Sequence, residues 1–403
     1  MIPVEEARTA VLAACRPLPV ETLALGDALG LVTAEPVVAP EPVPPFDNTA
    51  MDGYAVRSAD TAAAPVRLRV AGTLAAGSAP EVVVGAGEAV RIMTGAPMPP
   101  GADAVVMVEY TEAAGDKVEV HHAALPGDHV RRAGEDLPAG EEVFPAGTVL
   151  RPGHLGVIAS TGRAAIAVRR RARVGVLSTG DELADPGAPL APGRIRDSNR
   201  PTLLALLRQS GCEAVDLGRC GDSEDAIRTA LKAAVERCDA VLTSGGVSVG
   251  DFDYVKVVLE ELAAGTARWM QVAVRPAKPL AFGVVERAGA GVPVFGLPGN
   301  PVSSMVSFEL FARPALLAMM GHTVLDRPRV EAVADEPLAR RPDGKLHLVR
   351  VVVDYAGSRH HARSAGGQGS HMLRAMATAN GLALLADGTG VEQGGSVEVM
   401  LLS

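Results

Sequence analysis

Residues 240–253 read AVLTSGGVSVGDFD, a short apolar run followed by a glycine-rich loop. Two further stretches have the same form, VGVLSTGDE at 174–182 and PVFGLPGNP at 293–301. Segments with helical spacing separate the three, so strand alternates with helix as in an open, mostly parallel sheet. Ligands of such sheets bind beyond the carboxyl ends of the strands, where all three loops would lie. The sequence therefore predicts an α/β domain over residues 173–326 with a binding site at one sheet edge.

The loop Ser244–Asp253 combines glycines, hydroxyls and carboxylates. Glycines let backbone N–H groups approach an anion without interference from Cβ, which suits a phosphate. The residues predicted to bind substrate here are Ser244, Gly245, Gly246 and Ser248. Asp251 and Asp253 could hold Mg²⁺ against that phosphate, because hard cations prefer carboxylate and phosphate oxygens. The alternative is a plain strand-to-helix turn in which Asp251 caps the helix.

Adjacent carboxylates at Asp181 and Glu182 directly follow the first strand. They could form a solvated helix start, since negative charge is favourable near a helix N-terminus. Beside the 244–253 loop they could instead bind a metal ion or orient water, and the spacing leaves both readings open. The predicted metal ligands are Asp181, Glu182 and Asp253.

Two later stretches are candidates for binding an anion. Arg275 and Lys278 lie in RPAKP, where prolines hold both cations with little entropy to lose; the alternative is an exposed connector. Residues 296–301 form a turn before a helix whose N-terminus could face an anion, although Gly and Pro also serve purely structural turns. The substrate-binding residues predicted in this turn are Pro298, Gly299, Asn300 and Pro301.

Helix starts are expected at two polar residues of the α/β domain. Asn199 is expected to cap a helix that runs through Leu203 and Leu207, and Asp222 to cap the next one. The stretch MDGY at 51–54 reads as a loop, because Asp-Gly favours a turn. Ser370, in GGQGSH, also reads as a loop residue that could donate to a ligand.

Length and composition bound the organisation of the chain. At 403 residues it should hold roughly two to four domains. Strand-like segments bounded by turns fill residues 46–144, and apolar alternation returns after residue 327. We expect an elongated subunit with four parts: an N-terminal linking domain (1–45 and 145–172), a β-rich insertion (46–144), the α/β domain (173–326) and a small, barrel-like all-β C-terminal domain (327–403).

Charge and motif content exclude several classes of function. A net charge of −9 offers no broad basic field for nucleic acid. The four cysteines form no C-x-x-C pair, which favours reduced thiols in a cytoplasmic protein. Acids near the N-terminus argue against a signal peptide, and no apolar stretch is expected to reach the roughly 18 residues of a membrane span. Zinc-type histidine spacing, a Walker A sequence and G-x-G-x-x-G after a strand are all absent.

Six runs, distributed along nearly the whole chain, resemble one known family. They are PFDNTAMDGYAV (45–56), RIMTGAPMP (91–99), STGDEL (178–183), LTSGGVSVGDFDY (242–254), RPAKPLAFG (275–283) and GLPGNPVS (296–303), with support from GED (134–136) and QGSH (368–371). In this order they resemble the molybdopterin molybdenumtransferases, known as MoeA in bacteria and as the C-terminal domain of gephyrin in animals.

The resemblance implies a homodimer of four-domain subunits with a central domain like that of the molybdopterin adenylyltransferases. It implies conversion of adenylylated molybdopterin and molybdate, with Mg²⁺, to molybdenum cofactor and AMP. A molybdopterin adenylyltransferase would act upstream, and molybdoenzymes would receive the product. The active-site positions that it implies are Asp52, Thr94, Asp136, Glu182, Asp222, Asp253, Lys278, Arg350 and Ser370. Arg275 stands where family members often carry lysine, and a guanidinium changes the anion geometry.

Two other functions remain open at this level. The first is a molybdopterin adenylyltransferase, which would consume ATP; the extra domains and the 45–56 stretch argue against it. The second is a dimeric scaffold of the gephyrin type, which a tight peptide ligand would reveal. Scaffolding in gephyrin needs a further domain and a long flexible linker, and we expect neither here.

Overall fold

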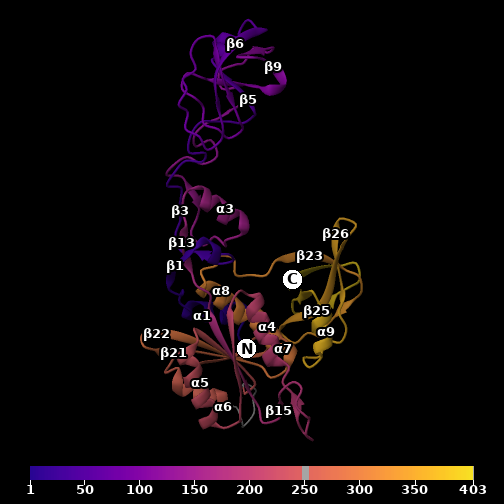
Figure 1. Ribbon diagram of the computed structural model, residues 1–403. Helices are drawn as coiled ribbons and strands as arrows, with labels where there is room; N and C mark the ends of the chain where they lie inside the picture. Colours follow the sequence, from indigo (N-terminus) through magenta and orange to yellow (C-terminus); the bar gives the residue numbers. More distant parts are fainter. Residues whose placement is uncertain (247–253, 403) are drawn as a thin grey trace. The chain divides into compact units, whose positions relative to one another are not determined.

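The computed structural model describes residues 1–246 and 254–402 and divides the chain into two compact units. The first unit comprises residues 1–21, 30–34 and 168–403, and the second comprises residues 22–29 and 35–167. Short strands lie where the chain passes between the units: β1 Val20–Ala24, β2 Val32–Thr33 and β13 Ala165–Arg169. The helices and strands of both units are labelled in Figure 1.

A six-stranded sheet forms the centre of the first unit, in the order β17-β14-β18-β22-β21-β19. Its strands are β14 Arg173–Thr179, β17 Glu213–Cys220, β18 Ala240–Ser244, β19 Arg268–Gln271, β21 Pro279–Arg287 and β22 Ala290–Leu297. The four strands β17, β14, β18 and β22 are parallel; β21 is antiparallel to β22, and β19 is antiparallel to β21. The expected open, mostly parallel sheet is therefore confirmed.

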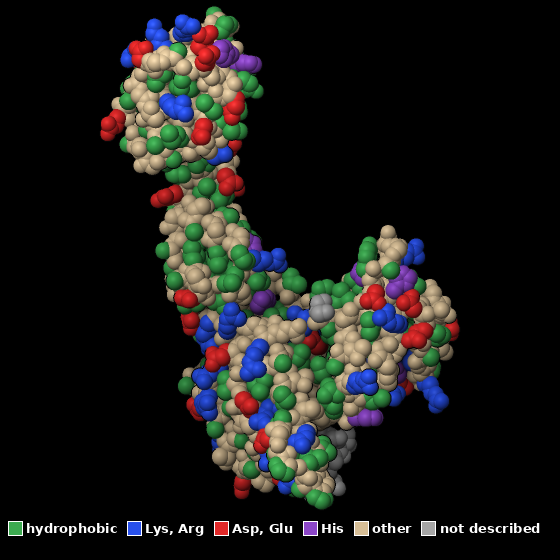
Figure 2. Space-filling model, turned by 45° about the vertical axis from the view of Figure 1, so that its right-hand side comes forward, with side chains coloured by type: hydrophobic (Ala, Val, Ile, Leu, Met, Phe, Trp, Pro, Cys, Tyr) green, Lys and Arg blue, Asp and Glu red, His purple; other side chains and the backbone are tan. Residues whose placement is uncertain are grey.

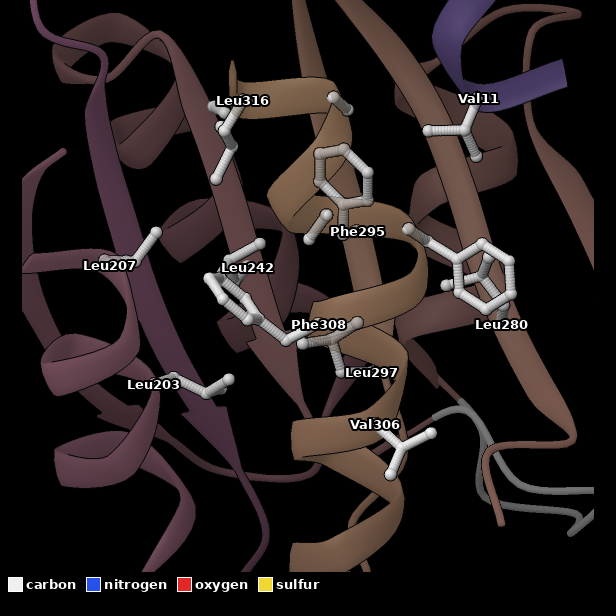
Figure 3. Packing of buried hydrophobic residues seen from close by; sticks show 14 of the residues in the cluster. Val11, Leu203, Leu207, Leu242, Leu280, Phe295, Leu297, Val306, Phe308 and Leu316 are labelled. Atoms are coloured by element: carbon white, nitrogen blue, oxygen red, sulfur yellow. The ribbon is translucent and has the colours of Figure 1, made fainter. Parts of the chain in front are cut away.

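Helices cover both faces of this sheet, because neighbouring strand residues point to opposite sides. They are α1 Val4–Ala14, α4 Asn199–Gln209, α5 Glu224–Arg237, α6 Tyr254–Leu262, α7 Pro301–Ser307 and α8 Arg313–Met319. Leu242 packs with α1, α4, α7 and α8 in one buried cluster (Figure 3), whereas Val241 packs with α5 and α6 in another. The opening helix α1 thus belongs to this core through Ala7 and Val11, not to the linking segments.

Within residues 1–246 and 254–402, one helix is long and apolar enough to cross a membrane by length and composition. It runs from Pro301 to Met319, and 78% of it is buried inside the protein, as in the core helix of a soluble fold. The expectation that no stretch reaches this length is therefore wrong. A π-helical turn, η3 Phe308–Ala312, precedes Pro314. Proline has no backbone N–H, so the regular α-helical hydrogen-bond pattern is interrupted there.

The C-terminal part of the first unit is a closed barrel, as expected. Its strands are β23 Arg329–Ala334, β25 Leu346–Ala356, β26 Arg359–Ser364, β27 Gly381–Leu385 and β29 Ser396–Leu401. The ladder β25-β26-β23-β29-β27 closes because β27 also pairs with β25. Strand β20 (Val274–Arg275) joins β25 in parallel, so the barrel is hydrogen-bonded to the RPAKP segment of the α/β domain. The smaller elements are β15 Leu183–Ala184, β16 Ile195–Arg196, β24 Leu338–Ala339, α9 Leu373–Thr378 and β28 Gly390–Val391.

The second unit is β-rich, as expected, and its main sheet has the order β8-β5-β7-β6-β10-β9. These strands are β5 Gly53–Val56, β6 Val66–Leu74, β7 Glu88–Ile92, β8 Ala104–Met107, β9 Thr111–Ala114 and β10 Lys117–Val120. Smaller elements are β3 Val37–Val38, β4 Asn48–Thr49, α2 Ser58–Thr61, β11 Val130–Arg131, β12 Glu142–Phe144 and α3 Pro152–Ser160. Acidic and basic side chains are interspersed on the face of the molecule shown in Figure 2.

Gly53 occupies a position in β5 that admits no side chain. A Cβ there would lie 2.1 Å from the backbone oxygen of Val106 on the neighbouring strand. Gly53→Ala is therefore expected to lower the free energy of unfolding of this unit by about 3 kcal/mol, measured by urea unfolding. Gly26→Ala, where no atom lies within 4 Å of the added Cβ, is the control. Equal stability of the two variants would contradict the packing described.

Candidate functional site

Three loops at the carboxyl ends of β14, β18 and β22 line one cavity of about 650 Å³. The first contributes Gly180 and Glu182, the second Ser244–Gly246, and the third Pro298–Pro301. Parallel strands bring their carboxyl ends to the same edge, which is why loops far apart in sequence meet here. The structure thus brings together most residues predicted for substrate binding in the α/β domain. Ser248, Asp251 and Asp253 lie outside the described residues.

The loop after β18 requires glycine at two positions. Gly245 has φ +98°, and a Cβ there would lie 2.7 Å from the backbone oxygen of Thr179. Gly246 has φ +67°, and its Cβ would lie 2.5 Å from a methyl carbon of Val255. Side chains at either position would displace the strand end or the following helix. The glycines therefore permit close packing as well as an open approach to the loop backbone.

Asn199 joins two of the loops, a role that differs from the one expected. Its Nδ2 donates to Ser244 Oγ and to the backbone oxygen of Gly299, both at 2.7 Å. Ser198 occupies the position before the helix, so the prediction that Asn199 caps α4 is wrong. The side chain turns to the sheet edge because a buried hydroxyl and a carbonyl there need a donor.

Carboxylates from two loops meet at the same edge. The N–H of Asp181 donates to Asp222 Oδ2 at 3.0 Å, and the N–H of Asp222 donates to Asp181 Oδ1 at 3.4 Å. Ser223, whose Oγ accepts from Ala226 N at 3.3 Å, caps α5, so the expectation that Asp222 is the cap is wrong. Asp222 and Glu182 both line the large cavity.

Glu182 and Asp222 are the carboxylates of the large cavity that could bind Mg²⁺. Among the described residues, no three carboxylate, histidine or cysteine side chains are grouped to enclose a metal ion. Mg²⁺ in phosphate-transfer sites is held through one or two carboxylates together with substrate phosphates and water. Glu182 and Asp222 supply oxygen donors of that kind, so the site fits a magnesium ion that arrives with a phosphate.

A second cavity, of about 290 Å³, is lined by three cations. Arg275, Lys278 and Lys345 contribute the charges, and Ser370 contributes a hydroxyl. Lys345 pairs with Asp343 at 3.0 Å, whereas no ion pair of the described residues involves Arg275 or Lys278. Positive charge therefore exceeds negative charge around this cavity, which suits an anion.

The two cavities adjoin. Pro279 and Ser303 line both of them, and Ser303 lies in the first turn of α7. The N-terminus of the 19-residue helix that begins at Pro301 therefore faces this junction. Backbone N–H groups at a helix start carry partial positive charge and favour anions.

Arg350 does not line the small cavity; its side chain is fully buried beneath the loop that carries Ser370. Its Nη2 donates to the backbone oxygens of Gly367 at 2.8 Å and Gly369 at 3.3 Å. Gln368 adds two bonds to the backbone of Arg350, at 3.0 and 3.1 Å. Burial lowers the pKa of this guanidinium. In the structure Arg350 therefore supports the loop, and the expected direct contact with substrate stays a prediction.

In the second unit the structure brings Asp52 and Thr94 together. The N–H and the Oγ1 hydroxyl of Thr94 both donate to Asp52 Oδ1 at 2.7 Å. The backbone hydrogen bond from Thr94 is the main cause that lowers the pKa of Asp52, with smaller help from the hydroxyl and Arg91. Asp136 lies on another turn, where its N–H donates to Val43 O at 3.0 Å.

Sequence reasoning missed three residues around these cavities. Asn199 was expected only as a helix cap, and Ser303 was not singled out from the run GLPGNPVS. Lys345 belongs to no motif, since it stands alone at the start of an alternating strand. Only a strand pairing between β20 and β25, which the sequence does not reveal, brings Lys345 to Arg275.

The fold and the cavities define a class of protein: a multidomain protein with two adjoining cavities, one of them lined by cations, at the edge of its α/β domain. Three family models match the chain in order: "MoeA N-terminal region (domain I and II)" over residues 2–162, "Probable molybdopterin binding domain" over 175–318 and "MoeA C-terminal region (domain IV)" over 331–402. The chain belongs to the MoeA family of molybdopterin molybdenumtransferases, which confirms the resemblance seen in its motifs.

Individual relatives extend over nearly the whole chain. The "Molybdopterin molybdenumtransferase 2" of Mycobacterium tuberculosis is 42% identical over 381 residues, covering 92% of this chain and 91% of that protein. The molybdopterin molybdenumtransferase of Haemophilus influenzae is 39% identical over 386 residues, covering 94% and 93%. The crystal structure of a molybdopterin biosynthesis MoeA protein from Pyrococcus horikosii matches with TM-score 0.86 and 31% identity, covering 100% and 99%.

Proposed function

We propose that this protein inserts molybdate into adenylylated molybdopterin, with Mg²⁺, to give molybdenum cofactor and AMP. Membership in the family of molybdopterin molybdenumtransferases supports molybdenum insertion in cofactor biosynthesis. The observation that carries the finer proposal is the pair of cavities that share Pro279 and Ser303. Two adjoining cavities of this kind would bind a large organic anion and a small oxyanion side by side.

The large cavity is the proposed site for the adenylylated pterin. Its volume of about 650 Å³ is in the range of small-molecule pockets. The Gly245-Gly246 backbone and the helix start at Pro301 offer N–H groups to a pyrophosphate. Asn199 links the two loops, because its side chain donates a hydrogen bond to each of them.

The small cavity is the proposed site for molybdate, an oxyanion similar to sulfate. Arg275 offers planar, paired donors and Lys278 offers a compact charge, so the two cations together would offset the charge of a tetrahedral dianion. Ser370 adds a hydroxyl donor, and Arg350 fixes the loop that presents it. Molybdate bound here would lie beside the substrate in the neighbouring cavity.

The carboxylates would serve the leaving phosphate. Glu182 and Asp222 line the large cavity, and Asp181 and Asp222 fix each other through backbone hydrogen bonds. Asp253 is proposed as a further ligand. A magnesium ion bound with the substrate would offset the charge that develops as AMP leaves.

We also infer a cytoplasmic homodimer that takes its substrate from a molybdopterin adenylyltransferase and supplies molybdoenzymes. In a homodimer, Asp52, Thr94 and Asp136 of one subunit could serve the site of its partner. The paired hydrogen bonds from Thr94 keep the Asp52 carboxylate oriented and support its assignment to the active site. Two carboxylates and a hydroxyl could bind or orient a metal-linked substrate.

Release of AMP from adenylylated molybdopterin tests the proposal. With Mg²⁺ present, AMP release that depends on molybdate and yields active cofactor is the expected result. Pterin adenylylation at the expense of ATP, with no molybdate-dependent release, would show that the protein acts one step earlier.

Asn199→Ala is expected to raise the KM for adenylylated molybdopterin about tenfold, because the Ser244 hydroxyl and the Gly299 carbonyl both lose their donor. Gln209→Ala, at the other end of α4 and outside this cavity, is the matched control and should leave the KM unchanged. Steady-state kinetics on both variants makes the comparison. An unchanged KM for the Asn199 variant would show that Asn199 does not contribute to substrate binding.

A further inference from the structure

Lys345 lines the small cavity, although it belongs to none of the sequence motifs described above. It precedes β25 of the C-terminal barrel, whereas Arg275 and Lys278 belong to the α/β domain. The three cations line a space of only about 290 Å³, and none of the described residues that line it is acidic. Like charges held this close repel each other, so the arrangement favours binding of an anion.

The backbone on both sides of Lys345 is held in place. The buried guanidinium of Arg340 donates to the backbone oxygen of Lys345 at 2.6 Å. The N–H of Leu346 donates to Ala273 O at 2.9 Å, and Val274 pairs with Leu346 in the β20–β25 ladder. The position of Lys345 is thus coupled directly to the strand that carries Arg275.

The side chain of Lys345 is also oriented, by a carboxylate that does not line the cavity. Its Nζ lies 3.0 Å from Asp343 Oδ2, and its side chain is 21% exposed. The other oxygen, Asp343 Oδ1, accepts from Arg340 Nη2 at 2.9 Å and lies 3.0 Å from His347 Nε2. The hydrogen bond from Lys345 is the main cause that lowers the pKa of Asp343 to about 2. Asp343 is therefore ionised at neutral pH and forms an ion pair with Lys345.

We propose that Lys345 is a third cationic ligand of the oxyanion, held ready by Asp343 as a positioning residue. An ammonium group has three N–H donors, and the bond to Asp343 uses one of them. The other two are free to donate to oxygens of a tetrahedral dianion beside Arg275 and Lys278. This inference rests on the proposed function, since it assigns a further residue to the same oxyanion site.

Molybdate binding to the full-length protein, measured by isothermal titration calorimetry with sodium molybdate alone, tests the assignment. Lys345→Gln is expected to weaken binding about tenfold, the loss of one charge-assisted hydrogen bond. Lys345→Arg, which keeps the charge, should stay within a few-fold of the natural protein. Lys232→Gln, on the exposed face of α5, is the control and should bind normally.

A kinetic measurement separates binding from structural damage. The same Lys345→Gln variant should raise the KM for molybdate and leave the KM for adenylylated molybdopterin unchanged. If Lys345→Gln binds molybdate normally while Arg275→Gln does not, the inference about Lys345 is wrong and the proposed function stands. If the natural protein binds no molybdate and releases AMP without it, both are wrong.

Discussion

Glu182→Ala is expected to lower kcat for AMP release about a hundredfold to a thousandfold, as when one preorganised electrostatic group is removed from an active site. Glu182 lines the large cavity, and its side chain is exposed, so truncation removes no core packing. Its carboxylate lies on the same edge as the Asp181–Asp222 pair. The substitution should therefore lower kcat and leave the stability of the folded protein almost unchanged.

Two measurements decide this prediction. Single-turnover AMP release gives the chemical rate, and the thermal unfolding temperature should match that of the natural protein. Glu236→Ala, an exposed glutamate on α5 away from both cavities, is the control. Turnover retained in the Glu182 variant would remove this carboxylate from the mechanism.

Arg350→Ala is expected to lower the free energy of unfolding by about 3 kcal/mol, from lost packing and lost hydrogen bonds. The side chain is fully buried, and two carbonyls of the 367–369 segment depend on its Nη2. Lysine should not restore stability, because its narrow ammonium leaves unfilled the buried space that the planar guanidinium occupies. Because the segment leads into Ser370, the KM for molybdate should also rise.

Arg359→Ala, an exposed arginine on the neighbouring strand β26, is the matched control. It should leave the urea midpoint almost unchanged, since surface arginines contribute little to stability. An Arg350 variant as stable as the Arg359 variant would contradict the supporting role. Loss of stability with an unchanged KM for molybdate would show that Arg350 stabilises the barrel without affecting molybdate binding.

The glycine-rich loops were the most predictable part of this protein. Apolar runs identified β14, β18 and β22, and parallel-sheet topology then requires that their loops share one edge. The alternation after residue 327 likewise predicted the barrel. These features depend on local periodicity and turn chemistry, which a single sequence carries.

Side-chain partners were less predictable, because they depend on tertiary contacts. Asn199 and Asp222 were expected as helix caps, yet each bonds to a loop across the sheet edge. Gly53 reads as a turn residue but begins a central strand, because only glycine fits against Val106 there. A lone lysine such as Lys345 carries no local signal at all. Arg350 was assigned by resemblance, and its burial depends on how the barrel packs.

The central claim is that molybdate binds in the small cavity, beside the substrate in the large cavity. The most direct test is to locate the bound molybdate in a crystal. Crystals of the full-length protein soaked with molybdate should show an anomalous-difference peak between Arg275, Lys278 and Ser370. The same crystals with AMP and Mg²⁺ should show the nucleotide in the cavity lined by Gly245 and Asn300. A molybdate peak at another place, with the cavity at Arg275 empty, would contradict the account.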